Sequence, residues 1–158
     1  MSIAIRPAPV RKSLFVRCRP ARAFEVFTAG MGGWWLKTHS LTKSGQAGVT
    51  IEPRAGGRWY ETGRDGETCD WGRVEAWEPP HRVLLIWTLN ADFTTDPPVP
   101  TEVEVTFAAE GEGTRVTLEH RGLEAHGARG EETRGVLDSG NGWGGLLAAF
   151  AGAAADAA

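Results

Sequence analysis

The chain has 158 residues, of which 41% are hydrophobic and 23% are charged, and its formal net charge is -3. This length and composition predict one domain with a buried core, and the absence of a strong basic excess argues against a nucleic-acid-binding protein. No apolar run is long enough to cross a membrane.

The N-terminal part predicts one strand followed by one or two short helices. Hydrophobic residues alternate over 10–16, as they do in a half-buried strand. Pro20 fits the first turn of a helix that runs to about Thr28, and residues 31–35 predict a second short helical turn. Residues 37–48 are predicted to form a loop.

The middle of the chain predicts an antiparallel meander. Its strand-like segments are 49–52, 57–62, 71–77, 82–89, 101–107 and 114–120. Turn-forming residues separate them, and Asp65-Gly66 is typical of a hairpin. The last two segments predict a shared buried face, made by Val103, Val105, Phe107, Val116, Leu118 and His120.

The C-terminal part returns to helical spacing. Its apolar stripe consists of Trp143, Leu146, Leu147 and Phe150. Ser139 or Asn141 would cap the start of this helix, and the alanine-rich tail is expected to fray. Only this helix is long enough to cover the meander, so the sequence predicts an α+β fold: a curved antiparallel sheet of about six or seven strands wrapped around a long C-terminal helix. We expect a single domain over residues 1–158, with a core over about 10–152 and flexible ends.

Metal, nucleotide and covalent chemistry have no matching motif. The histidines at positions 39, 81, 120 and 126 follow no HxH or HExxH spacing, with His126 expected in a loop. The glycine-rich stretch 142–145 lacks the lysine of a phosphate-binding loop, and no nucleophile elbow occurs. We therefore assign no catalytic residues, metal or cofactor.

Two titratable residues allow a functional and a structural interpretation. Alternation places His120 on a buried face, where it either exchanges a proton with a ligand or bonds to a backbone carbonyl. Glu61 is either a solvated cross-strand neighbour of Arg73 and Glu75 or, in the opposite strand phase, a buried carboxylate that orients a polar ligand group or serves as a base.

Seven tryptophans in so short a chain indicate an aromatic core or an aromatic pocket. Trp143 begins the apolar stripe of the last helix, which fits either role, and Trp34 is buried or half exposed. The phase of Trp87 stays open because both faces of its segment are apolar. Phe93 lies in the polar, proline-rich loop 92–100 and is placed to cover the mouth of a cavity.

The remaining signals concern the compartment. Met1 to Pro7 contain no apolar stretch of the kind found in secretory signals. Cys18 and Cys69 lack the spacing of a metal or redox motif and are expected to be reduced thiols. These features predict a cytoplasmic protein.

A set of short motifs runs through residues 10–150 in a characteristic order. They are Arg19-Pro20-Ala21 through Thr28, Trp34-Trp35, Glu52 to Trp59, Trp71 to Glu75, Pro79 to Trp87, Gly113 to Leu118, and Gly142-Trp143. In this order the chain resembles the SRPBCC (START/Bet v 1-like, helix-grip) superfamily, and within it the group similar to the C-terminal domain of the activator of Hsp90 ATPase. The resemblance implies the helix-grip fold, with a cavity between the sheet and the C-terminal helix.

The resemblance, combined with the aromatic content, predicts that the chain binds a small hydrophobic or aromatic molecule in that cavity. The candidate lining residues are Trp35, Trp59, Glu61, Trp71, Trp87, Phe93, Phe107, His120, Trp143 and Leu147. One alternative is a polyketide cyclase- or hydrolase-like enzyme on the same fold. Another is a protein-interaction module, with an Hsp90-type chaperone as partner, although the outward residues Glu102, Glu104, Thr117 and Glu119 argue against an apolar docking face. A homodimer through an edge strand or the helix is a further option.

Overall fold

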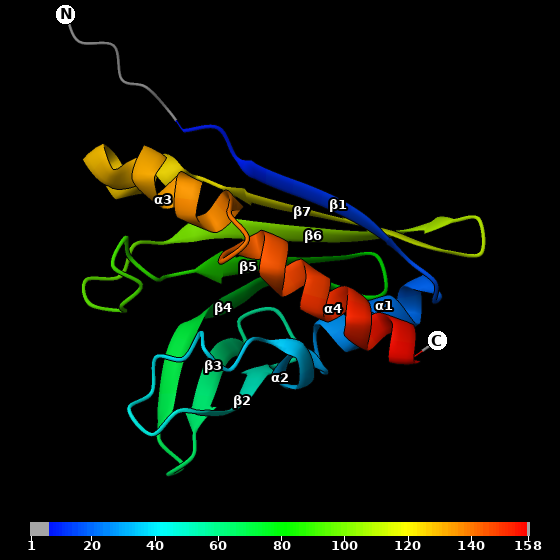
Figure 1. The fold of residues 1–158 in the computed structure, drawn as a ribbon, viewed down its shortest axis with the longest axis horizontal. Coiled ribbons are helices and arrows are strands. Elements are labelled where there is room, and N and C mark those ends of the chain that lie inside the picture. Colours follow the sequence, from blue (N-terminus) through cyan, green and yellow to red (C-terminus); the bar gives the residue numbers. More distant parts are fainter. Residues whose placement is uncertain (1–6, 158) are drawn as a thin grey trace, which may run out of the picture.

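A seven-stranded antiparallel sheet forms the framework of the protein (Figure 1). This computed structural model describes residues 7–157, so the expectations for residues 1–6 and 158 fall outside it. The strands are β1 (Val10–Val16), β2 (Gln46–Ile51), β3 (Arg58–Gly63), β4 (Thr68–Glu78), β5 (Arg82–Trp87), β6 (Thr101–Glu110) and β7 (Gly113–Arg121). They follow the order β1-β7-β6-β5-β4-β3-β2, which is a meander closed at one edge by β1.

The helices are α1 (Pro20–Phe27), α2 (Met31–Trp34), the 3₁₀ helix η1 (Leu123–Arg129), α3 (Gly130–Asp138) and α4 (Trp143–Ala157). Helix α4 lies across the concave side of the sheet, with α1 beside its C-terminal end (Figure 1). This arrangement confirms the helix-grip prediction. No helix in the described part of the chain is long and apolar enough to span a membrane.

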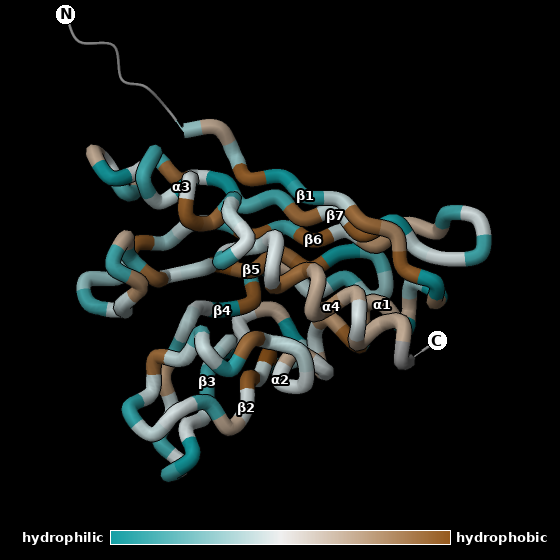
Figure 2. The backbone as a smooth tube through the Cα atoms, in the orientation of Figure 1, coloured by the Kyte–Doolittle hydropathy of each residue, from teal (hydrophilic) through white to brown (hydrophobic). Residues whose placement is uncertain are grey.

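The buried face of the sheet follows from alternation along β6 and β7, where hydrophobic and hydrophilic positions alternate (Figure 2). All six residues predicted to share this face are at most 1% exposed. Phe107 on β6 packs edge-on against Phe27 of α1, which also meets Phe150 of α4. Aromatic side chains therefore join the sheet to both helices.

The helical part after β7 differs from the prediction in three places. No helix is predicted between residue 120 and Ser139, but η1 and α3 occupy residues 123–138, and His126 lies in η1 rather than in a loop. The Ser139 hydroxyl donates to the Val136 carbonyl and accepts from the Asn141 N–H, so it closes the end of α3. The many polar residues of α3 explain the omission, because they dilute its apolar stripe.

A glycine makes the break between α3 and α4 possible. A Cβ atom at Gly142 would lie 2.4 Å from the carbonyl oxygens of Val136 and Leu137. The chain therefore turns tightly enough for Trp143 to enter the core at the first residue of α4, where it is 1% exposed.

Candidate functional site

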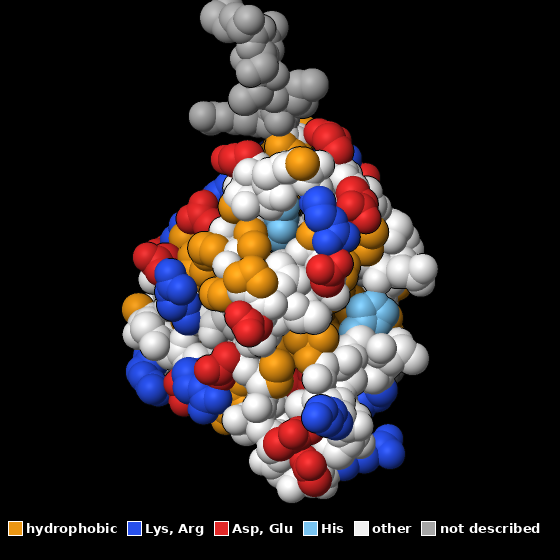
Figure 3. Space-filling model, turned by 90° about the vertical axis from the view of Figure 1, so that its left-hand side faces the viewer, with side chains coloured by type: hydrophobic (Ala, Val, Ile, Leu, Met, Phe, Trp, Pro, Cys, Tyr) orange, Lys and Arg blue, Asp and Glu red, His pale blue; other side chains and the backbone are white. Residues whose placement is uncertain are grey.

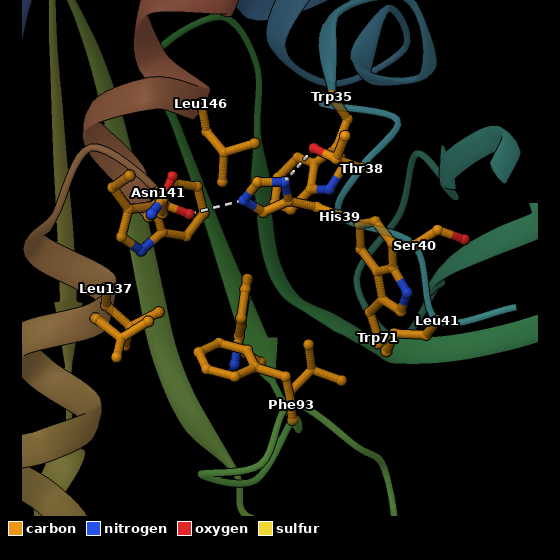
Figure 4. A pocket seen from close by; sticks show the side chains of 15 residues that line it. Trp35, Thr38, His39, Ser40, Leu41, Trp71, Phe93, Leu137, Asn141 and Leu146 are labelled. Atoms are coloured by element: carbon orange, nitrogen blue, oxygen red, sulfur yellow. Dashed lines mark hydrogen bonds between the residues drawn. The ribbon is translucent and has the colours of Figure 1, made fainter. Parts of the chain in front are cut away.

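A hollow of about 250 Å³ lies between the sheet and the C-terminal helices. We call it the aromatic pocket. Its lining residues are Trp35, Thr38, His39, Ser40, Leu41, Trp71, Trp87, Leu89, Phe93, Val136, Leu137, Asn141, Gly142, Trp143 and Leu146. They come from β4, β5, the loops after α2 and β5, and the junction of α3 with α4. Segments far apart in sequence therefore meet around one space (Figure 4).

Four tryptophans form a continuous wall of the pocket. Trp35 lies 4.9 Å from Trp71, 6.4 Å from Trp87 and 5.9 Å from Trp143, measured between ring centroids. Trp59 packs behind this wall, 5.7 Å from Trp87. These separations are typical of interacting aromatic pairs, so the rings support one another as a rigid surface.

Gly72 on β4 gives these rings the space to meet. It pairs with Trp59 of β3 on one side and with Trp87 of β5 on the other. A Cβ atom there would lie 1.7 Å from the Ile86 carbonyl oxygen and 3.4 Å from Cε3 of Trp59. Any side chain at this position would push β4 and β5 apart and separate the two indoles.

Phe93 covers one side of the pocket from the loop between β5 and β6 (Figure 4). Its backbone has a φ of 59°, which is unusual for a bulky residue and costs about 1 to 2 kcal/mol. Asn90 maintains this conformation, because its side-chain oxygen accepts the N–H groups of Asp92 and Thr94. Asp92 also forms an ion pair with Arg129 at 2.7 Å, which ties the loop to the end of η1.

The loop lies at the end of the molecule shown in Figure 3, where hydrophobic side chains reach the surface between charged ones. Such a border of charge around apolar surface is typical of the mouth of a binding site.

Polar groups line the opposite side of the pocket. The imidazole of His39 spans the gap between the loop after α2 and the α3–α4 junction (Figure 4). Its Nε2 lies 2.7 Å from the backbone oxygen of Asn141, and its Nδ1 lies 3.2 Å from the hydroxyl of Thr38. A carbonyl oxygen can only accept, so Nε2 carries a proton.

Glu61 holds this polar loop in place from inside the protein. Its side chain is 0% exposed, and its carboxylate accepts the Leu41 N–H at 2.8 Å, the Ser40 hydroxyl at 2.5 Å and the Thr42 hydroxyl at 2.7 Å. Burial alone would raise the pKa of Glu61, but these hydrogen bonds outweigh it, and the pKa lies below its usual value. The ionised carboxylate therefore acts as an anchor for the loop.

His120 lies behind the tryptophan wall and is 0% exposed. Its Nδ1 accepts the indole N–H of Trp143 at 3.0 Å, so the proton of the neutral ring is on Nε2, which donates to the Thr101 hydroxyl at 2.7 Å. Burial, with a smaller effect from His126, lowers the pKa of His120 to about 3. His120 is thus a neutral residue that positions Trp143.

Five of the ten predicted residues line the pocket, namely Trp35, Trp71, Trp87, Phe93 and Trp143. The other five, Trp59, Glu61, Phe107, His120 and Leu147, are buried outside its lining. The strand phases left open are now settled, since Glu61 and Trp87 both point inward. Trp34 is buried as well, and its indole donates to the Val26 carbonyl.

The polar side of the pocket is not predicted by the sequence. Thr38, His39 and Ser40 lie in a loop without periodicity, and Asn141 was expected only as a cap of the last helix, without α3 before it. The one available signal was the polar run Thr38-His39-Ser40, which begins three residues after the pair Trp34-Trp35.

Elsewhere in the described residues the molecule offers less for a ligand or a metal. No group of three or more histidine, cysteine, aspartate or glutamate residues in residues 7–157 is arranged to hold a metal ion. A second hollow of about 420 Å³ lies between α1 and β2, near Trp77 and Pro79. It is larger, but it has only two aromatic side chains and few polar groups that could orient a ligand.

Comparisons with known proteins agree with this architecture. The family model described as activator of Hsp90 ATPase homolog 1-like protein matches residues 17–155. Among solved structures, an anthrahydroquino-gamma-pyrone synthase, Txn09, complexed with SUM, is 38% identical, with a TM-score of 0.64. The match covers 94% of this chain and 97% of the synthase.

Two further solved structures share the fold. The self-sacrificing resistance protein CalC from Micromonospora echinospora is 26% identical over 94% of this chain and 95% of its own, with a TM-score of 0.68. The Aha1 dimer from Colwellia psychrerythraea is 12% identical over 94% and 97%, with a TM-score of 0.63. No curated protein matches the chain.

Proposed function

We propose that this chain, which belongs to the family of activator of Hsp90 ATPase homolog 1-like proteins, binds a planar aromatic molecule of two or three fused rings in the aromatic pocket. The observation that carries the proposal is the wall of four tryptophans around a space of about 250 Å³. A dry protein cavity of about 150 Å³ holds benzene, so this space suits a larger fused system.

The lining carries no permanently charged side chain, which suits an aromatic ligand that enters the pocket without charge. None of the fifteen lining residues is an aspartate, glutamate, lysine or arginine. Burying apolar ligand surface against these rings contributes about 25 cal/mol of favourable binding free energy per Å². The indole N–H groups of Trp35 and Trp71 are buried without a hydrogen-bond partner among the described residues, so a ligand carbonyl would gain these donors only if the indoles turn toward it.

A second candidate function is enzymatic. The relative that is 38% identical is named a synthase of an anthrahydroquino-gamma-pyrone, which is a fused aromatic product. A ring-closing activity on an aromatic polyketide would use the same pocket. Binding requires less than catalysis does, because the pocket lining alone supports it and no catalytic group is needed.

A chaperone-type interaction has less support. The convex face of the sheet carries ion pairs of Arg121 with Glu102, Glu104 and Glu119. Such a charged face is a poor match for an apolar docking surface.

Cys18 and Cys69 are both free thiols, which supports a reducing, cytoplasmic location for the proposed binding protein.

Tryptophan fluorescence tests the proposal directly. Titration with anthraquinone, naphthoquinone and a long-chain fatty acid should give a saturable quench with the fused aromatics, because four indoles line the pocket. A flat response to both quinones from the folded protein would contradict the proposal.

Phe93 provides a matched mutational test. We expect Phe93→Ala to weaken anthraquinone binding by about tenfold. An aromatic contact contributes about 0.5 to 1.5 kcal/mol to the binding free energy, in addition to the free energy of burying its apolar surface. The control is Phe15→Ala, because Phe15 is 41% exposed on β1 and lies outside the pocket. Equal dissociation constants for the two variants in calorimetry would place the ligand elsewhere.

A further inference from the structure

His39 is the single titratable side chain among the fifteen residues that line the aromatic pocket. It is half buried at the rim, and Thr38 beside it is exposed and also lines the pocket. The bond from Nε2 to the Asn141 carbonyl leaves Nδ1 of the neutral ring as an acceptor for the Thr38 hydroxyl. The oxygen of that hydroxyl keeps its own lone pairs for a ligand.

The protein holds this arrangement from several directions. The backbone N–H of His39 donates to the Leu36 carbonyl at 3.0 Å, and its carbonyl oxygen accepts from the Gln46 side chain at 3.5 Å. Gln46 is 3% exposed, and the buried carboxylate of Glu61 fixes the next residues of the loop. Two buried polar residues thus support one short loop, which is the kind of support that positions a reactive group.

We propose that Thr38 and His39 form a proton-accepting pair that ionises a phenolic hydroxyl of an aromatic ligand in the pocket. The inference rests on the proposed function, because the ligand must first occupy the aromatic pocket. It adds a chemical class to that function, namely hydroxylated planar aromatics.

The step transfers one proton in two linked moves. The phenolic O–H bond breaks and its proton moves to the Thr38 oxygen, while the proton of that hydroxyl moves to Nδ1 of His39. The electron pair of the broken bond stays on the ligand as a phenolate. The imidazolium keeps its Nε2–H bond to the Asn141 carbonyl, so a hydroxyl, a base and an orienting acceptor act in series.

A coloured phenol makes the proposal measurable. We would titrate 2-hydroxyanthraquinone bound to the protein and follow the absorption of its phenolate, with 2-methoxyanthraquinone as the probe that cannot ionise. His39→Gln retains an N–H for Asn141 but takes up no proton, and Thr38→Val keeps the shape while it removes the hydroxyl. Circular dichroism checks that each variant is folded.

We expect the bound phenol to ionise about one pH unit lower than the free dye. This shift means that the protein binds the phenolate about tenfold more tightly than the neutral phenol. Both variants should lose this shift, and any change in their affinity for the methoxy probe measures the effect of each substitution on binding alone. A shift that persists in both variants would overturn the proton-accepting pair while leaving the binding function intact. If the wild type binds neither dye, the proposed function itself fails, and the inference fails with it.

Discussion

Replacing His120 with alanine is expected to lower the free energy of unfolding by about 3 to 5 kcal/mol, as truncation of a buried ring usually does. The imidazole is 0% exposed, and its loss would leave a cavity behind the tryptophan wall. It would also leave the indole N–H of Trp143 without its acceptor. Urea denaturation followed by circular dichroism measures the change.

His120→Asn and His81→Ala are the matched controls for this prediction. The asparagine side-chain oxygen lies close to the position of Nδ1 and can accept from Trp143, so we expect about half of the loss seen with alanine. His81 is exposed, and its replacement should change stability by less than about 0.5 kcal/mol. Equal stabilities of the wild type and His120→Ala would show that the Trp143–His120–Thr101 chain does not stabilise the fold.

The same residue predicts a pH dependence. The pKa of His120 is about 3 in the folded state and near 6.5 when it is unperturbed, so between these values the unfolded chain binds the extra proton. Stability is therefore full above about pH 6.5 and falls as the pH drops, by up to about 1.4 kcal/mol per pH unit from this residue. The pKa of His126 is also lowered, by burial and by Arg129, and it adds to the slope.

Between pH 6.5 and 5, the difference between the wild type and His120→Asn isolates the contribution of His120, because Glu61 stays ionised and His126 is present in both proteins. The wild type should lose stability more steeply than His120→Asn, which has no titrating group at that position. Parallel slopes would mean that His120 is not buried as a neutral ring.

The framework around these residues was predictable from the sequence because it depends on local periodicity. Alternation in β6 and β7 placed Phe107 and His120 on the buried face, and the stripe of α4 placed Trp143 and Phe150 against the sheet. Each pattern reports which face of an element is apolar, and a meander can bury such faces in few ways.

The pocket was predictable only in part because a lining depends on contacts between distant segments. Alternation shows that His120 is buried, but it does not show that Trp143 occupies the space in front of it. The polar rim of Thr38 and His39 lies in a loop whose conformation depends on Glu61. This residue bonds to Ser40 and Leu41 across separations of 21 and 20 residues in the sequence. No local pattern carries that information, so the loop was recognised only as a loop.

Because one buried carboxylate holds the rim in place, its removal is expected to cause a second large loss of stability. Glu61→Ala is expected to lower the free energy of unfolding by about 3 kcal/mol, because the donors of Ser40, Leu41 and Thr42 lose their common acceptor. Since the folded pKa of Glu61 is lowered, this stabilisation is present above its usual pKa of 4.5 and is lost as the pH falls below it. Thermal and urea denaturation at pH 7 measure the loss.

A loosened loop should also weaken the pocket, because Ser40 and Leu41 are part of its lining. We expect Glu61→Ala to bind anthraquinone about tenfold more weakly than the wild type, even though its side chain does not line the pocket. Glu67→Gln is the control, since the exposed carboxylate of Glu67 accepts the Lys43 N–H at the outer end of the same loop. If Glu61→Ala loses stability but keeps full affinity, the rim is positioned by other contacts. If it loses both while Glu67→Gln loses neither, the buried carboxylate couples the stability of the sheet to the shape of the pocket.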